Sequence, residues 1–119
     1  MRAVEAAFDK KAEDPVVLDL RGISDVTDYF LICHGSSDRQ VLAIVDSIEE
    51  RLRSDLGRRP SHVEGRRAAD WVLMDYHDFL VHVFRDDRRQ FYRLESLWSD
   101  APTIDLSELT PAEQDARSG

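Results

Sequence analysis

Residues 71–84 have the sequence WVLMDYHDFLVHVF, and this stretch decides the fold. Two apolar runs, 71–75 and 79–84, are separated by the short link 76–78. Apolar runs of this length around a short link predict two β-strands that form a hairpin. The strands of a hairpin are antiparallel, so at least part of the sheet must be antiparallel.

The segments on either side of this hairpin predict the remaining elements. A helix is predicted over residues 38–56, with Ser37 and Gln40 as a capping box at its start and Gly57 as its C-terminal cap. Its apolar stripe at helical spacing comprises Val41, Ile44, Val45, Ile48, Leu52 and Leu56. The other predicted elements are helices over 2–13 and 87–98, strands over 16–20 and 29–33, and a short edge strand over 61–65.

This order of elements predicts an α/β (α+β) fold, a mixed five-stranded sheet flanked by helices. We expect residues 1–101 to form one domain and residues 102–119 to be an acidic, mostly flexible tail. From Ser99 onward the chain holds five acidic residues and one basic residue, which supply −4 of the net charge of −8.

Composition excludes several classes of function. A net charge of −8 over 119 residues disfavours binding to nucleic acid that depends mainly on phosphate neutralisation, but it permits a basic partner. No apolar run approaches the length of a membrane span, and residues 2–14 lack the apolar core of a signal peptide. The single cysteine, Cys33, cannot form an internal disulfide, so we expect a cytoplasmic protein.

The motifs that could indicate catalysis or ligand binding are interpreted as structural. Gly35-Ser36-Ser37 between a strand and a helix could bind phosphate, but the phosphate-loop pattern is incomplete, and a helix cap is the simpler interpretation. Cys33 and His34 are neighbours in a strand and point to opposite faces. None of the four histidines has metal-ligand spacing, and His82 is interpreted as a hydrogen-bonded core histidine. We therefore expect no cofactor, no metal and no catalytic residues.

Several sequence motifs in order resemble the Iojap family, the ribosomal silencing factors. The resemblance covers residues 14–101, and any one motif alone is weak. The matching segments are DLR at 19–21, TDYFLI at 27–32, GSSDRQ at 35–40, EG at 64–65, DWVLMDY at 70–76, VHVF at 81–84 and FYRLESLWSDA at 91–101. His77 departs from the family, which often has Gly at this turn; His tolerates a positive φ better than most residues.

The resemblance implies a nucleotidyltransferase-like fold without the catalytic carboxylates. It implies a non-enzymatic protein that binds the large ribosomal subunit through its ribosomal protein fourteen and blocks joining of the small subunit, which represses translation when nutrients are short. It also implies that the chain can form a homodimer. Two alternatives stay open: an assembly factor for the large subunit, and a nucleotide-binding enzyme built on Gly35 and Ser36.

The candidate partner-binding residues lie in and around the hairpin. Trp71 and Leu73 are expected to be apolar anchors that share one strand face with Asp75. Tyr76 and Asp78 are expected to extend this patch at the turn, with Glu64 joining from the neighbouring strand. Ordinary core packing is the alternative interpretation of Trp71 and Leu73. The local arginine clusters are interpreted as solvated surface, with a minor contact to ribosomal RNA as the alternative; they are Arg58-Arg59, Arg66-Arg67 and Arg85/Arg88/Arg89/Arg93.

Overall fold

The computed structural model describes residues 2–25, 27–86 and 101–104. The predicted hairpin is confirmed: β4 (Trp71–Asp75) and β5 (Phe79–Arg85) pair antiparallel, with Leu73 opposite His82. The predicted turn geometry is also confirmed, because His77 has a φ of 72°. This hairpin forms the core of one five-stranded sheet.

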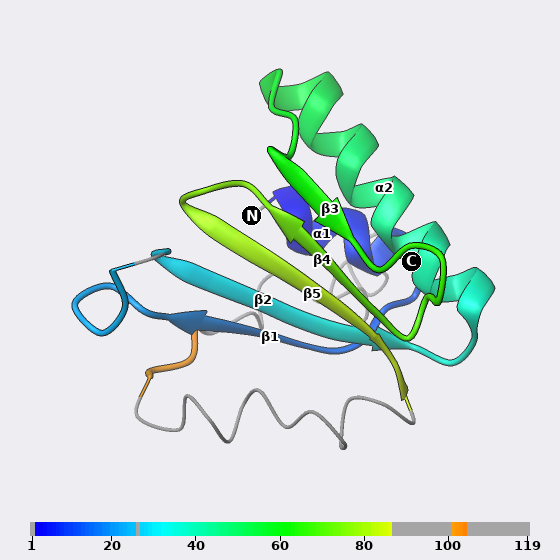
Figure 1. Cartoon of the computed structure of the whole chain (residues 1–119), viewed down its shortest axis with the longest axis horizontal. Coiled ribbons are helices and arrows are strands. Elements are labelled where there is room, and N and C mark those ends of the chain that lie inside the picture. Colours follow the sequence, from blue (N-terminus) through cyan, green and yellow to red (C-terminus); the bar gives the residue numbers. More distant parts are fainter. Residues whose placement is uncertain (1, 26, 87–100, 105–119) are drawn as a thin grey trace, which may run out of the picture.

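The sheet has the strand order β1-β2-β5-β4-β3 and mixed pairing, as predicted. β1 (Glu13–Asp19) pairs antiparallel with β2 (Tyr29–Gly35), which pairs parallel with β5. β3 (His62–Glu64) pairs antiparallel with β4 and lies at the edge. The last strand of the described chain is therefore the central strand of the sheet (Figure 1).

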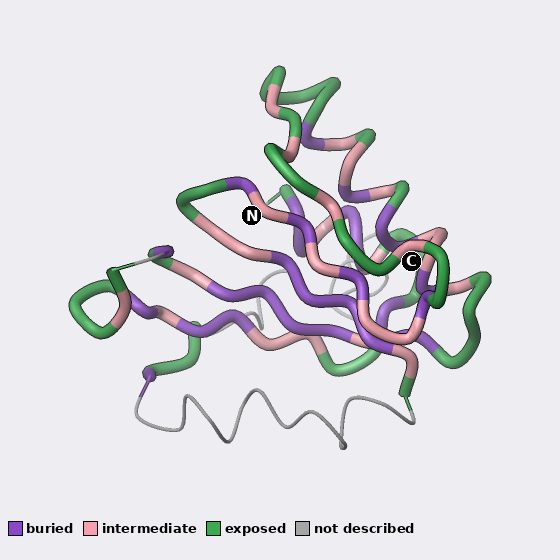
Figure 2. The backbone as a smooth tube through the Cα atoms, in the orientation of Figure 1, coloured by how far each residue is buried: buried purple, intermediate pink, exposed green. Residues whose placement is uncertain are grey.

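Two helices, α1 (Arg2–Asp9) and α2 (Asp38–Leu56), cover one face of the sheet (Figure 1). Five members of the predicted stripe of α2 are fully or almost fully buried in this layer. Leu56 was wrongly included in the stripe: it is 51% exposed because the helix ends there. Figure 2 shows the buried positions concentrated along the central strands and the inner side of α2.

The caps of α2 form where they were predicted, with one difference. The backbone N–H of Gln40 donates to Ser37 Oγ at 3.1 Å, and Gly57 adopts the left-handed conformation after the last turn. The side-chain oxygen of Gln40 accepts from the backbone N–H of Ser36 at 2.6 Å, one residue before the expected partner. Its Nε2 donates to the carbonyl of Lys11 at 2.9 Å, which ties the end of α1 to the start of α2.

The first helix is shorter than the sequence predicted, and the following strand starts earlier. α1 ends at Asp9 because Lys11 adopts a φ of 60° and the N–H of Ala12 donates to the carbonyl of Ala7. This left-handed closure ends a helix as a glycine would. β1 then begins at Glu13, ahead of the predicted start at residue 16.

The outer edge of β1 is lined by a short C-terminal segment. The Asp19 N–H donates to the Pro102 carbonyl at 2.8 Å, the Ile104 N–H donates to the Val17 carbonyl at 2.9 Å, and Thr103 forms a bridge with Leu18. Residues 102–104 thus follow β1 antiparallel. The flexible tail was predicted to begin at residue 102, but residues 102–104 pair with β1. The helix predicted over 87–98 and residues 105–119 of the tail lie outside the described residues, so both stay predictions.

Candidate partner-binding surface

The face of the sheet turned away from α1 and α2 carries the candidate surface. Along β4, Val72 and Met74 are buried against the helices, whereas Trp71, Leu73 and Asp75 are partly buried on the opposite side. This is the alternation that the sequence predicted for the three residues. The face is apolar toward β2 and β5 and becomes polar toward the β3 edge.

Glu64 joins this face from the neighbouring strand, as predicted. It is the register partner of Leu73, and the two residues line a shallow hollow of about 260 Å³ together with Gly65 and Trp71. The Glu64 carboxylate lies 2.7 Å from His62 Nε2 at the exposed edge. We name the surface formed by Glu64, Trp71, Leu73 and Asp75 the outer patch.

Trp71 is held within the outer patch by two aromatic neighbours. Its ring stacks on Phe84 with 5.3 Å between centroids, and its indole Nε1–H donates to His82 Nδ1 at 3.0 Å. His82 is almost fully buried, which confirms the prediction of a hydrogen-bonded core histidine. The identity of its partner was not predicted, because Trp71 and His82 meet only across the strand register.

Tyr76 is not brought to the outer patch. Its side chain is 1% exposed and lies in the core beneath the helices, stacked on Phe79 with 4.8 Å between ring centroids. Burial raises the pKa of the Tyr76 phenol to about 12. The strand alternation simply continues one residue past β4, so Tyr76 follows Val72 and Met74 to the helix side.

Asp78 lies at the turn, where it is paired with an arginine. Arg58 Nη2 donates to Asp78 Oδ1 at 2.6 Å and also to the carbonyl of Tyr76 at 2.9 Å. The Arg58 guanidinium lies 5.3 Å from the centroid of the Phe79 ring. The hydrogen bond from Arg58 holds the pKa of the Asp78 carboxyl below its usual value. This contact fastens the loop after α2 to the hairpin.

We predict that Arg58→Ala lowers the free energy of unfolding by about 1 to 2 kcal/mol at pH 7, since an ion pair and a cation–π contact are lost. Because the pKa of Asp78 is lower in the folded state, the contribution of the pair is present above the unfolded pKa and is lost as the pH falls through the folded pKa. The difference in the free energy of unfolding between Arg58→Ala and wild type should therefore shrink below about pH 3.8.

Urea unfolding of both proteins at several pH values measures this difference. Arg59→Ala is the matched control, since Arg59 is the exposed neighbour of Arg58. A loss that stays constant through the whole acid titration of Asp78 would show that packing rather than charge carries the effect.

Two other arginines of the predicted basic clusters, Arg66 and Arg85, also meet acidic groups. Arg66 pairs with Asp46 and Glu49, each at 2.9 Å, and Arg85 pairs with Asp38 at 2.8 Å. These ion pairs neutralise part of the positive charge that a contact with RNA phosphates would use.

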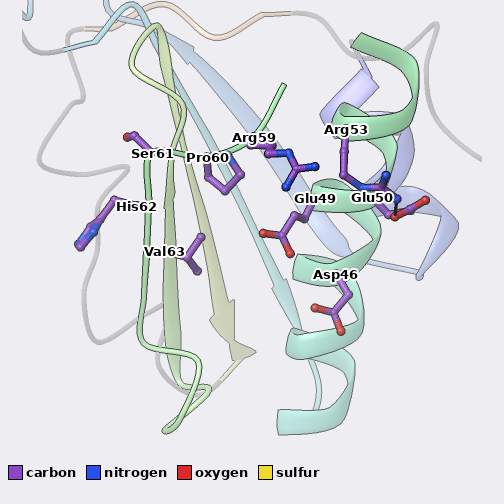
Figure 3. A pocket seen from close by; sticks show the side chains of 9 residues that line it. All are labelled: Asp46, Glu49, Glu50, Arg53, Arg59, Pro60, Ser61, His62 and Val63. Atoms are coloured by element: carbon purple, nitrogen blue, oxygen red, sulfur yellow. Dashed lines mark hydrogen bonds and ion pairs between the residues drawn. The ribbon is translucent and has the colours of Figure 1, made fainter. Parts of the chain in front are cut away.

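A larger hollow of about 710 Å³ lies between α2 and β3 (Figure 3). Its acidic side chains are Asp46, Glu49 and Glu50, of which the first two pair with Arg66 and the third with Arg53. Within the described residues, no group of three or more His, Cys, Asp or Glu side chains could hold a metal ion. No helix in that part of the chain has both the length and the apolarity needed to cross a membrane.

Comparisons with known proteins identify the class. The family model described as ribosomal silencing factor during starvation matches residues 1–119. The ribosomal silencing factor RsfS of Bacillus subtilis is 51% identical over 104 residues, covering 87% of each chain. A crystal structure from Bacillus halodurans is similar with a TM-score of 0.77 and 46% identity, covering 87% of this chain and 93% of that one.

A more distant relative is the mouse protein named mitochondrial assembly of ribosomal large subunit protein 1. It is 30% identical over 92 residues, which are 76% of this chain and 40% of that protein. These matches define a class of regulatory proteins associated with the ribosome. The chain belongs to the ribosomal silencing factor family, which confirms the resemblance found in the sequence.

Proposed function

We propose that this chain is a non-catalytic repressor of translation that binds the large ribosomal subunit and blocks joining of the small subunit. The outer patch is the proposed contact, and ribosomal protein fourteen of the large subunit is the proposed partner. The observation that carries the proposal is the position of Trp71, a partly buried indole fixed between Phe84 and His82 on a sheet face that the described helices do not cover. Large, rigid aromatic side chains of this kind are typical anchors of protein interfaces.

The charges around the outer patch support a basic protein partner. Glu64 and Asp75 flank the apolar anchors, and the chain as a whole carries a net charge of −8. Complementary charge speeds association and selects the partner more than it adds affinity. The proposed place of action is the cytoplasm, where ribosomal subunits join.

Steric exclusion needs only affinity and position. A factor that binds free large subunits but not joined ribosomes opposes joining by RT ln(1 + [L]/Kd), about 2.7 kcal/mol at a hundredfold excess over Kd. Repression should therefore rise with the concentration of the factor and fall when free small subunits are added in excess. No reaction step is required of any residue.

A sucrose gradient tests this function. Added to purified subunits under conditions that favour joining, the protein is expected to sediment with large subunits and to deplete joined ribosomes in proportion to its concentration. Sedimentation with large subunits without loss of joined ribosomes would contradict silencing and favour the second candidate, an assembly factor, which the name of the mouse relative supports. Absence from the large-subunit fraction would contradict both.

The nucleotide-binding alternative finds less support at its proposed site. The backbone N–H and the hydroxyl of Ser36 both donate to the side-chain oxygen of Gln40, at 2.6 and 2.9 Å. These donors are the ones that a phosphate would need. Titration with nucleoside triphosphate and magnesium, with no saturable binding expected, tests this alternative.

A further inference from the structure

Among the described residues, His82 is the one buried imidazole, and it contacts the proposed anchor Trp71 directly. It lies on the central strand β5 and is 4% exposed, between Phe30 on one side and Trp71 on the other. The Phe30 ring meets it edge-on, with 4.6 Å between centroids. The imidazole therefore has little freedom to rotate.

The hydrogen bond with Trp71 fixes the tautomer of His82. Because Nδ1 accepts from the indole at 3.0 Å, the proton of the neutral ring is on Nε2. Burial lowers the pKa of His82 to about 4, so the ring stays neutral and remains an acceptor at neutral pH. Nε2 is buried and meets no hydrogen-bond acceptor among the described residues.

A buried polar atom without a partner has a cost, so a hydrophobic residue would suit the packing of this position better. What a histidine adds here is an acceptor for the one polar atom of the Trp71 side chain. With its N–H satisfied inside the protein and its ring stacked on Phe84, the indole holds one orientation and can present carbon surface outward. A side chain ordered before binding loses less entropy when a partner docks.

We infer that His82 is a positioning residue for partner binding: it acts through Trp71 by holding the indole in the orientation that the partner meets. This inference rests on the proposed function, because it assumes that Trp71 is part of the contact. It assigns no direct contact with the partner to His82.

The test compares variants that remove or keep the acceptor. His82→Leu removes it, whereas the side-chain oxygen of His82→Asn can occupy the place of Nδ1. Affinity for the large subunit is expected to fall about tenfold in His82→Leu, the scale of ordering one side chain, and to recover to within about threefold in His82→Asn. Should His82→Leu fail to fold, His82→Gln carries the same test, since its amide reaches the Nε2 position instead.

Two controls separate positioning from stability. Val83→Ala makes a cavity on the helix side of the same strand, so it lowers stability and should leave affinity unchanged. Trp71→Phe removes the indole N–H, so adding His82→Leu to it should weaken binding no further. The indole ¹⁵N–H resonance of Trp71, identified by its loss in Trp71→Phe, should shift in His82→Leu and return in His82→Asn.

The outcomes distinguish this inference from the proposed function. If His82→Leu binds as tightly as Val83→Ala while Trp71→Ala loses binding, the interface stands and the positioning role is wrong. If Trp71→Ala binds like wild type, the proposed contact fails and the positioning role fails with it. An indole resonance that does not respond to His82→Leu would also overturn the inference.

Discussion

Gly65→Ala is expected to lower the free energy of unfolding by about 3 kcal/mol or more, the upper range for a single substitution. Gly65 has a φ of 92°, and a Cβ placed on it would lie 2.1 Å from the carbonyl oxygen of Trp71. The obstacle is backbone, so no change of rotamer relieves it. The loop between β3 and β4 must shift, and the pairing of the edge strand must shift with it.

Gly57→Ala is the matched control for this prediction. Gly57 also has a positive φ, 64°, but a Cβ there would meet no atom within 4 Å. Gly57→Ala should therefore lower the free energy of unfolding by only about 1 to 2 kcal/mol, the strain of an alanine in the left-handed conformation. Urea unfolding followed by circular dichroism measures both variants. Equal losses for the two would mean that the close approach to Trp71 has no energetic weight.

The second large effect is expected at the outer patch. Trp71→Ala combined with Asp75→Lys should weaken binding to the large subunit by at least about 100-fold, because loss of a central aromatic anchor alone typically costs 2 kcal/mol or more. Reversal of the Asp75 charge places a like charge before a basic partner. Asp75→Lys alone should lose more affinity at low salt than at high salt, since screening weakens the repulsion.

Controls for this double variant concern charge and folding. Glu50→Lys makes the same change of net charge at an exposed position of α2, away from the outer patch, and should bind like wild type. The double variant must keep its cooperative unfolding transition, because Trp71 also packs on Phe84. A folded double variant that pulls down the purified partner as well as wild type would refute the outer patch as the contact.

The two helix ends show what could be predicted from the sequence and what could not. Both close in the same way, with a residue in the left-handed conformation and a hydrogen bond from the next N–H to a carbonyl of the last turn. At the end of α2 that residue is Gly57, and the end was predicted correctly. At the end of α1 it is Lys11, which gives no signal in a sequence, so the first helix was predicted too long.

The candidate site shows the same limit at the level of side chains. Alternation along 71–75 predicted correctly that Trp71, Leu73 and Asp75 share a face. Tyr76 was expected to extend the patch at the turn, but the alternation continues past β4 and buries it on the helix side. The partner of Asp78 is Arg58, twenty residues away, and the partner of Trp71 is set by strand register. Contacts of this kind depend on tertiary placement, which local patterns do not contain.

The central place of β5 has a consequence for how the domain is made. During synthesis, residues 2–64 emerge with α1, β1, β2, α2 and β3, but the strand that must lie beside β2 comes only at residues 79–85. Until then one long edge of β2 has no neighbour, and Ile32 and Cys33 lack much of their cover. Nascent chains with such an edge are prone to pair wrongly with one another. Folding of the sheet can therefore be completed only after the hairpin has left the exit tunnel.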